Sequence, residues 1–172
     1  MSDVMTRKTF VIAELGVNHN GDIGIAKEMV RSAAEARVDA IKLQTFDPSK
    51  LVTHSAQRAP YQVDKNSDET SQYEMLEQLR LTRDDHSEIK ELCDLCDLEF
   101  MSTAFDQESM EYLVHELAVS RLKIGSGDLT NGPLILAAAQ LELDILISTG
   151  MGNVFDIRTA LDIVAYGYSS EG

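Results

Sequence analysis

The sequence is poor in cysteine, proline and basic residues, and it has no tryptophan. Its two cysteines, Cys93 and Cys96, are too few for the disulfide framework of a small secreted domain. No apolar run approaches the roughly 18 residues that span a bilayer, and the first residues show no secretory signal. The 15 Lys and Arg stand against 29 Asp and Glu, and the formal net charge of −14 argues against nucleic acid or an anionic membrane surface as a partner. We therefore expect a cytoplasmic protein.

The chain does have the composition of a folded protein, because 44% of its 172 residues are hydrophobic, and its length suits one domain. Short apolar runs are typical of strands buried on both faces, and each is followed by a segment with helical spacing. This alternation predicts an α/β fold with a parallel sheet. The predicted strands are Thr9–Glu14, Asp39–Phe46, Glu99–Phe105, Arg121–Gly125 and Asp144–Thr149.

Helix ends are marked by capping residues. Thr82–Asp85 resembles a capping box, Asp106 can cap the following helix, and Asn131 precedes a Gly-Pro pair that starts another. The last helix is predicted from about residue 155 to residue 165, with Gly167 at its C-terminal cap. The apolar face of the first helix is predicted to consist of Ile25, Met29, Ala33 and Ala36. The polar segment from residue 47 to about residue 70 is predicted to be a long, substrate-covering loop.

Polar residues gather where the predicted strands end, and in parallel α/β folds these C-terminal ends form the ligand-binding face. Lys42 and Gln44 are two residues apart, so their side chains share one face of a strand. Burying an ammonium group without an anion is costly. Lys42 and Lys123, with small hydroxyl residues near them, therefore predict an anion site for phosphate or carboxylate.

Each of these residues also has a purely structural interpretation. Lys42 and Lys123 could be surface lysines whose stems cover apolar surface, and Glu14 could be an exposed or capping carboxylate. Cys93 and Cys96 could form a redox pair, but their position within a helix favours a role in core packing.

Five blocks of the sequence resemble the N-acetylneuraminate (sialic acid) synthase family, in the same order and at the same spacing. They cover most of the chain, and together they are far more specific than any one of them. The blocks are Ile12–Gly21, Ala40–Phe46, Ser102–Asp106, Lys123–Asn131 and Ser148–Met151.

The resemblance implies a (β/α)8 barrel of the TIM-barrel type, usually followed by a small antifreeze-like domain. It implies a C–C bond-forming transferase of sialic acid biosynthesis that condenses phosphoenolpyruvate with N-acetylmannosamine or a related amino sugar. In this family a divalent cation, manganese or magnesium, polarises the sugar aldehyde. Arg37 stands where the family's helix usually ends in glycine, so we expect it to adopt a turn that glycine makes more easily.

The resemblance also implies roles for single residues. Lys42 and Lys123 would hold the phosphate and carboxylate of phosphoenolpyruvate and stabilise the leaving phosphate. Glu14 would contact the sugar near the reacting centre, and Asp128, where many members carry Glu, would bind a sugar hydroxyl or orient water. The remaining substrate-binding residues would be Gln44, Tyr61, Asn66, Thr103, Phe105, Ser126 and Ser148.

A complete barrel takes about 250 residues, so we expect residues 1–172 to form about five β/α units of an incomplete barrel. The remaining strands, the antifreeze-like domain and the two metal-binding histidines of the family are expected to be absent from this chain. An open sheet exposes its edges, so we expect a homodimer or pairing with the missing half, and no turnover by the chain alone.

Two other functions stay open at this point. A lysine aldolase that forms a Schiff base would also place lysines at strand ends. Alternatively, the chain could be a non-catalytic remnant that binds anions or a partner subunit. The sequence does not identify the amino sugar.

Overall fold

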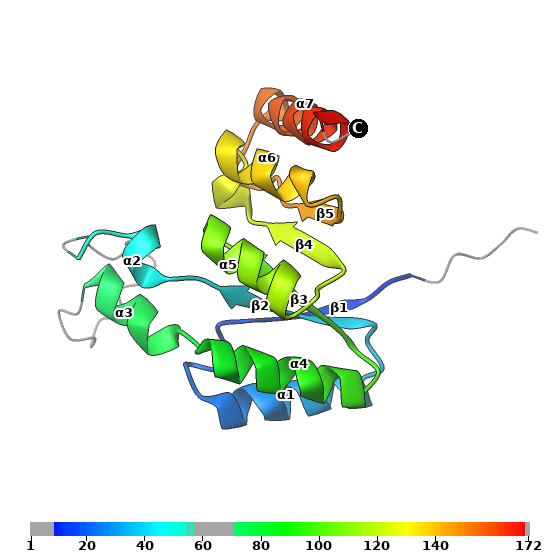
Figure 1. The fold of residues 1–172 in the computed structure, drawn as a ribbon. Coiled ribbons are helices and arrows are strands. Elements are labelled where there is room, and N and C mark those ends of the chain that lie inside the picture. The colour runs from blue at the N-terminus through cyan, green and yellow to red at the C-terminus, as the bar shows by residue number, and fades with distance from the viewer. Residues whose placement is uncertain (1–8, 55, 57–70, 171–172) are drawn as a thin grey trace, which may run out of the picture.

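The computed structural model describes residues 9–54, 56 and 71–170. Within them the chain forms a five-stranded sheet in the order β1-β2-β3-β4-β5, with every neighbouring pair parallel (Figure 1). Sequential parallel strands joined through helices are the repeating units of a (β/α)8 barrel, and the predicted α/β class with five such units is confirmed. The strands are β1 (Ile12–Gly16), β2 (Ala40–Thr45), β3 (Glu99–Ala104), β4 (Arg121–Ile124) and β5 (Asp144–Ile147).

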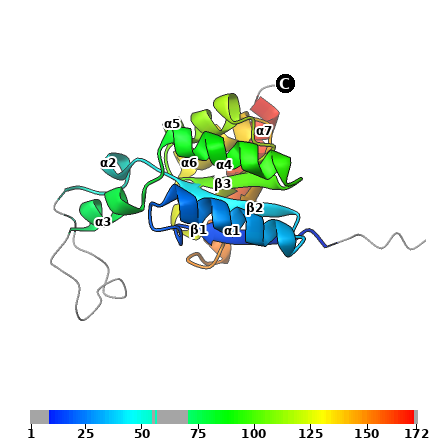
Figure 2. The same ribbon diagram turned by 90° about the horizontal axis from the view of Figure 1, so that it is seen from below.

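The helices follow one another around the sheet, from α1 and α4 at one end to α6 and α7 at the other (Figures 1 and 2). In the part of the chain that the structure describes, each helix is too short or too polar to cross a membrane. The helices are α1 (Ile23–Glu35), α2 (Pro48–Leu51), α3 (Gln72–Leu79), α4 (Arg83–Leu95), α5 (Gln107–Glu111, continued by a π-helical turn, Tyr112–Glu116), α6 (Gly132–Gln140) and α7 (Val154–Ser170).

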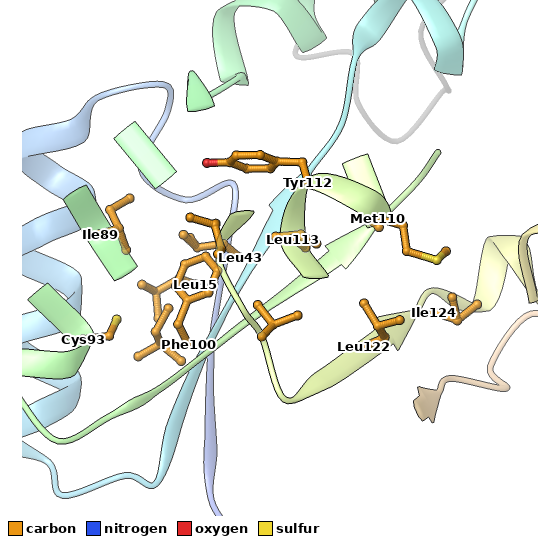
Figure 3. Close-up of a cluster of buried hydrophobic side chains, with 14 of the residues drawn as sticks. Leu15, Leu43, Ile89, Cys93, Phe100, Met110, Tyr112, Leu113, Leu122 and Ile124 are labelled. Atoms are coloured by element: carbon orange, nitrogen blue, oxygen red, sulfur yellow. The ribbon is translucent and has the colours of Figure 1, made fainter. Parts of the chain in front are cut away.

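The hydrophobic core lies between the helices and one face of the sheet. Figure 3 shows Ile89 and Cys93 of α4 directed toward Leu43 and Phe100 of the strands, and all four belong to one buried cluster. Because side chains alternate along a strand, the residues next to these core positions must point to the opposite face of the sheet. That opposite face carries the polar residues of the candidate site.

The predicted helix caps are confirmed. Thr82 and Asp85 form a complete capping box at the start of α4. The Asp106 carboxylate accepts a hydrogen bond from the Ser109 amide at 2.9 Å, and the Asn131 side chain accepts one from the Leu134 amide at 3.3 Å. These caps define the residues at which α4, α5 and α6 begin.

One helix prediction was wrong, and a second holds only in part. Gly167 lies inside α7, which continues to Ser170. A Cβ at residue 167 would stand only 2.4 Å from the Cβ of Ala139 in α6. Glycine is required there by the close approach of two helices and not by a helix end.

The predicted apolar face of the first helix holds for Met29 and Ala33 but not for Ile25 and Ala36. In α1 the buried residues are Ala26, Val30 and Ala33, whereas Ile25 is 41% exposed.

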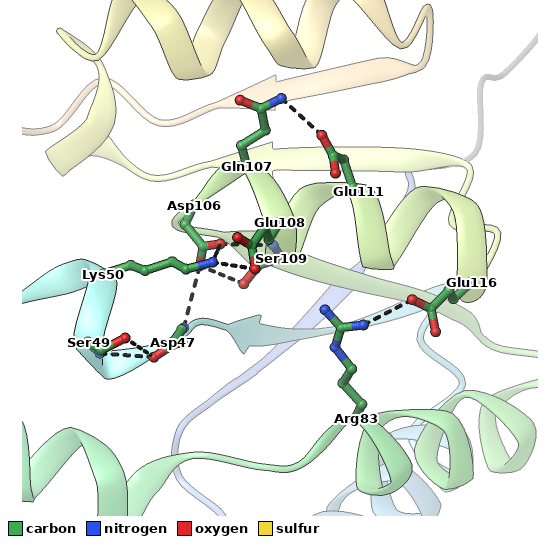
Figure 4. Close-up of polar contacts among 10 residues, drawn as sticks. All are labelled: Asp47, Ser49, Lys50, Arg83, Asp106, Gln107, Glu108, Ser109, Glu111 and Glu116. Atoms are coloured by element: carbon green, nitrogen blue, oxygen red, sulfur yellow. Dashed lines mark hydrogen bonds and ion pairs between the residues drawn. The ribbon is translucent and has the colours of Figure 1, made fainter.

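The segment after β2 is tied to the start of α5 (Figure 4). The Asp47 amide donates to the Asp106 carboxylate at 3.4 Å, and the Lys50 ammonium contacts the same carboxylate at 3.7 Å and also pairs with Glu108. Most of the predicted substrate-covering loop, including Tyr61 and Asn66, lies outside the described residues.

Candidate active site

The candidate site lies on the face of the sheet that points away from the helix-packed core. Strand register places Glu14 opposite Lys42, Gln44 opposite Thr103, and Thr103 opposite Lys123. Register partners in a parallel sheet point to the same side. Five predicted site residues from four neighbouring strands therefore share one face.

Lys42 is almost completely buried, with 8% of its surface exposed. Its Nζ lies 2.7 Å from Oε2 of Glu14 and donates a hydrogen bond to Oγ1 of Thr103 at 3.1 Å. A surface lysine would not be held in this way, so the surface interpretation is wrong for Lys42. Glu14 supplies the counter-charge, and its side chain stays 57% exposed, so the site is open to solvent on that side.

Lys123 is held by oxygen atoms from two strands. Its Nζ donates to Oγ of Ser148 and to the carbonyl oxygen of Ile124, each at 2.6 Å. Burial lowers the pKa of Lys123, the nearby positive charge of Lys42 lowers it further, and the charge of Glu14 partly offsets both effects. The two ammonium groups are therefore close enough to repel each other, and a bound anion would offset this repulsion.

Glu14 and Gln44 converge on Gly16, at the end of β1. Gly16 has a φ of 56°, and a Cβ at this position would stand 3.3 Å from Oε1 of Glu14 and 3.7 Å from Nε2 of Gln44. The left-handed backbone and the crowding both favour glycine. The acid and the amide thus lie beside each other at the C-terminal rim of the sheet.

Thr103, Phe105 and Asp128 converge on Gly125, directly after β4. A Cβ at Gly125 would lie 3.9 Å from the Asp128 Oδ2, 3.9 Å from the Thr103 methyl carbon and 4.0 Å from the Phe105 ring. The Phe105 ring also packs edge-on against Phe46, at 6.1 Å between centroids. Asp128 therefore reaches the site although it stands where the family often has Glu.

The other predicted residues divide into three groups. Ser148 lies in the site through its contact with Lys123, and Ser126 begins the short 3-10 turn after β4, close in sequence to Gly125. Ser102 points to the helix side, where its Oγ lies 2.7 Å from Oγ1 of Thr45, because it alternates with Thr103 along β3. Ser102 therefore lies outside the site, although it is one of the polar residues where the predicted strands end.

The histidine and acidic side chains do not form a metal site within residues 9–54, 56 and 71–170, where no three His, Cys, Asp or Glu residues cluster suitably. The residues described here therefore do not fit a complete set of ligands for manganese or magnesium, and no chemical step is assigned to a metal.

Cys93 is packed in the core, and both it and Cys96 are free thiols. Burial raises the pKa of the Cys93 thiol to about 12. Redox chemistry uses the thiolate, so the structure favours the core-packing role over a redox pair.

Of the two glycines that border the site, sequence reasoning identifies only Gly125, which lies between a predicted strand and a predicted helix, where backbone N–H groups can hold a phosphate. It missed Gly16 and the polar contacts behind the site. The approach of Gln44 to Gly16 and of Thr103 and Phe105 to Gly125 joins segments that are far apart in the sequence, so no local signal shows it. The orientation of Ser102, in contrast, follows from strand alternation once Thr103 is assigned to the site.

Comparison with known proteins gives consistent matches. Residues 29–171 match the family described as "NeuB family". The chain is 44% identical over 161 residues to the N,N'-diacetyllegionaminic acid synthase of Legionella pneumophila, covering 94% of this chain and 45% of that protein. It is 35% identical over 155 residues to the N-acetylneuraminate-9-phosphate synthase of Drosophila melanogaster, covering 88% of this chain and 41% of that protein.

Among solved structures, the N-acetylneuraminic acid (sialic acid) synthetase of Leptospira borgpetersenii in complex with citrate superposes with a TM-score of 0.77 at 28% identity. That match covers 93% of this chain and 51% of the other. The chain thus spans about half the length of the curated relatives it matches.

Proposed function

This chain belongs to the NeuB family, and we propose that it carries the phosphoenolpyruvate-binding half of a synthase that makes a sialic acid or a related nine-carbon ulosonic acid. The observation that carries the proposal is the pair of ammonium groups on one sheet face. Lys42 is buried against the Glu14 carboxylate and the Thr103 hydroxyl. Lys123 is half-buried against the Ser148 hydroxyl and the Ile124 carbonyl. Phosphoenolpyruvate carries a phosphate and a carboxylate on the same carbon, and two fixed cations match that charge distribution.

The reaction assigned to the complete synthase forms a bond from the enol carbon of phosphoenolpyruvate to the aldehyde carbon of an open-chain amino sugar. Water then adds to the carbon that bears the phosphate, the C–O bond to phosphate breaks, and inorganic phosphate leaves. Lys42 and Lys123 bind the substrate's anionic groups and stabilise the negative charge of the departing phosphate. Gln44 and Ser148 orient the same substrate.

Residues at the rim are assigned to the sugar. Glu14 is partly exposed and lies beside Gln44, so its carboxylate can meet a sugar hydroxyl near the new bond. Asp128, Thr103 and Phe105, gathered around Gly125, line the same side. The high identity to a legionaminic acid synthase favours a diacetamido sugar over N-acetylmannosamine as the acceptor.

We assign the remaining parts of the enzyme to polypeptide outside residues 1–172. They include the later barrel strands, the ligands of the manganese or magnesium ion, and an antifreeze-like domain. The chain by itself is proposed to bind phosphoenolpyruvate weakly and not to turn over, and to act as a homodimer or with a complementary half-barrel in the cytoplasm.

Calorimetric titration of residues 1–172 with phosphoenolpyruvate tests the anion site. Lys42→Ala and Lys123→Ala should each weaken binding by about tenfold or more, because each removes a charge-assisted contact. Lys90→Ala is the matched control, since Lys90 pairs with Asp94 on the outer surface of α4. Equal affinity in all four proteins would refute the anion site, and sialic acid formed by the chain alone would refute its inactivity.

The lowered pKa of Lys123 favours one rival, a Schiff-base aldolase, because a neutral amine is the nucleophile in that chemistry. Borohydride reduction in the presence of pyruvate separates the two. We expect no covalent adduct by mass spectrometry, whereas a stable adduct on Lys123 would favour the aldolase. If the chain binds phosphoenolpyruvate but shows no turnover, either as a homodimer or with a complementary half-barrel, the non-catalytic remnant would be supported instead.

A further inference from the structure

A chain of buried polar groups lies directly behind the candidate site, on the helix side of the sheet. The His86 Nδ1 lies 2.9 Å from the Thr82 carbonyl oxygen, and its Nε2 lies 3.0 Å from Oγ1 of Thr45. Oγ1 of Thr45 in turn lies 2.7 Å from Oγ of Ser102. His86, Thr45 and Ser102 are 2%, 7% and 0% exposed, so water does not replace these contacts.

The hydrogen bonds in this chain have a defined direction. A carbonyl oxygen only accepts, so Nδ1 of His86 carries the proton and donates to Thr82. Nε2 of neutral His86 therefore accepts from the Thr45 hydroxyl, whose oxygen accepts from the Ser102 hydroxyl. Every member has a partner, and burial lowers the pKa of His86, which favours the neutral ring that this arrangement needs.

The polar chain joins β2 and β3 next to the position where two predicted substrate-binding residues are register partners. Gln44 is the register partner of Thr103, and Thr45 and Ser102 are their immediate neighbours in β2 and β3. Neighbouring residues of a strand point to opposite faces, so fixing Thr45 and Ser102 from behind also fixes the backbone that presents Gln44 and Thr103. Thr103 in turn accepts the hydrogen bond from Lys42.

The ring of His86 is oriented by its surroundings. The rings of Phe100 and Tyr112, both labelled in Figure 3, lie edge-on to it at 6.5 Å and 6.4 Å between centroids. The Tyr112 hydroxyl donates to the Arg83 carbonyl at 2.7 Å and so holds that ring against the first turn of α4. Apolar side chains alone would fill this space without the cost of burying three polar groups.

We propose that His86 is a positioning residue for the phosphoenolpyruvate site, acting through Thr45 and Ser102 on Gln44, Thr103 and, by way of Thr103, Lys42. This inference rests on the proposed function for the identity of the ligand. The arrangement of Gln44 and Thr103 by the polar chain does not depend on any ligand, so the two claims can fail separately.

The test uses residues 1–172 and titrates phosphoenolpyruvate by calorimetry. Thr45→Val keeps the side-chain shape but removes the hydroxyl, and it should weaken binding by about fivefold, the equivalent of one lost hydrogen bond. His86→Gln should weaken it at least as much. Thr45→Ser, which keeps the hydroxyl, should restore affinity to within about twofold.

Ile89→Val is the matched control, because Ile89 is fully buried one turn later on α4 in the apolar core. It should lower the melting temperature as much as Thr45→Val does and leave the affinity unchanged. An unchanged affinity in Thr45→Val would overturn the inference. An equal loss of affinity in Ile89→Val would also overturn it, because the loss would then follow the melting temperature and not the hydroxyl.

A ligand-free measurement separates this inference from the proposed function. The NMR signals of the Gln44 carboxamide and the Thr103 methyl group should shift in Thr45→Val and stay in place in Ile89→Val. If the wild-type chain binds no phosphoenolpyruvate while these shifts occur, the proposed function fails and the positioning role stands. Signals that stay in place in Thr45→Val would refute the positioning role, whatever the chain binds.

Discussion

At the scale of single residues, the two site lysines differ in how their charge is balanced. Lys42 contacts the carboxylate of Glu14 at 2.7 Å, whereas within the described residues Lys123 is held by a hydroxyl and a carbonyl oxygen. Lys123 thus carries more of the unbalanced positive charge, and its lowered pKa reflects burial first and Lys42 second. An incoming anion therefore has its most favourable electrostatic interaction with Lys123.

This difference predicts how the pKa of Lys123 responds to its neighbours. Lys42→Gln removes a positive charge that disfavours the protonated amine, so the pKa of Lys123 should rise. Glu14→Gln removes the carboxylate that favours the protonated amine, so the pKa should fall. Titration of the lysine Cε signals by NMR measures both changes.

Opposite signs for these two variants are the decisive result. If Lys42→Gln leaves the Lys123 titration unchanged, the two ammonium groups do not act on each other and the shared anion site is refuted. Lys27→Gln is a suitable control, because Lys27 pairs with Glu88 on the helical surface.

At the scale of elements, the close contact of α6 with α7 depends on a glycine, which has no side chain. Gly167 lies inside α7 and faces Ala139 of α6, with room for a hydrogen atom only. Alanine inside a helix normally stabilises by about 1 kcal/mol relative to glycine. Overpacking a close helix contact costs about 1–3 kcal/mol, so here the steric cost decides the sign.

Gly167→Ala should therefore lower the free energy of unfolding by about 1 kcal/mol, although the substitution favours helix formation. Urea denaturation followed by circular dichroism measures the change. The double variant Gly167→Ala with Ala139→Gly should recover part of the loss, because it removes the opposing methyl group. A Gly167→Ala protein more stable than wild type would show that the helices are not closely packed at this point.

At the scale of the whole molecule, the β5 end of the sheet carries several exposed apolar side chains. Phe155 is 76% exposed, Leu161 is 56% exposed and Tyr166 is 64% exposed, all on α7. A cavity of about 390 Å³ between β5 and α7 is lined by Ile145, Ile147 and further apolar residues. Exposed apolar patches of this kind beside a sheet edge favour association.

We therefore expect the chain to associate with itself in a concentration-dependent manner, as measured by sedimentation velocity. Leu161→Lys should reduce the association, because it places a charge in the apolar surface at the mouth of this cavity. Leu95→Lys is the control, since Leu95 is 85% exposed but lies on α4, at the other end of the sheet. A wild-type chain that stays monomeric at high concentration would contradict this expectation.

Several features were readable from residues close together in the sequence. The caps at Thr82, Asp106 and Asn131 act over three residues, so local chemistry identifies them. Arg37 has a φ of 58°, as expected from its place at a helix end where glycine is usual. The shared face of Lys42 and Gln44 likewise follows from the two-residue period of a strand.

The sequence by itself determined the alternation of strands and helices, the starts of α4, α5 and α6, and the strands that carry Glu14, Lys42, Gln44, Thr103 and Lys123, because these depend on short-range periodicity and hydrogen bonding. Only the tertiary structure decided that Glu14 pairs with Lys42, that Gly167 packs inside a helix against Ala139, and that the Ser102 hydroxyl contacts that of Thr45. Each of these contacts joins residues from different elements. Their distances are set by strand register and helix packing across the whole fold, which no local pattern records.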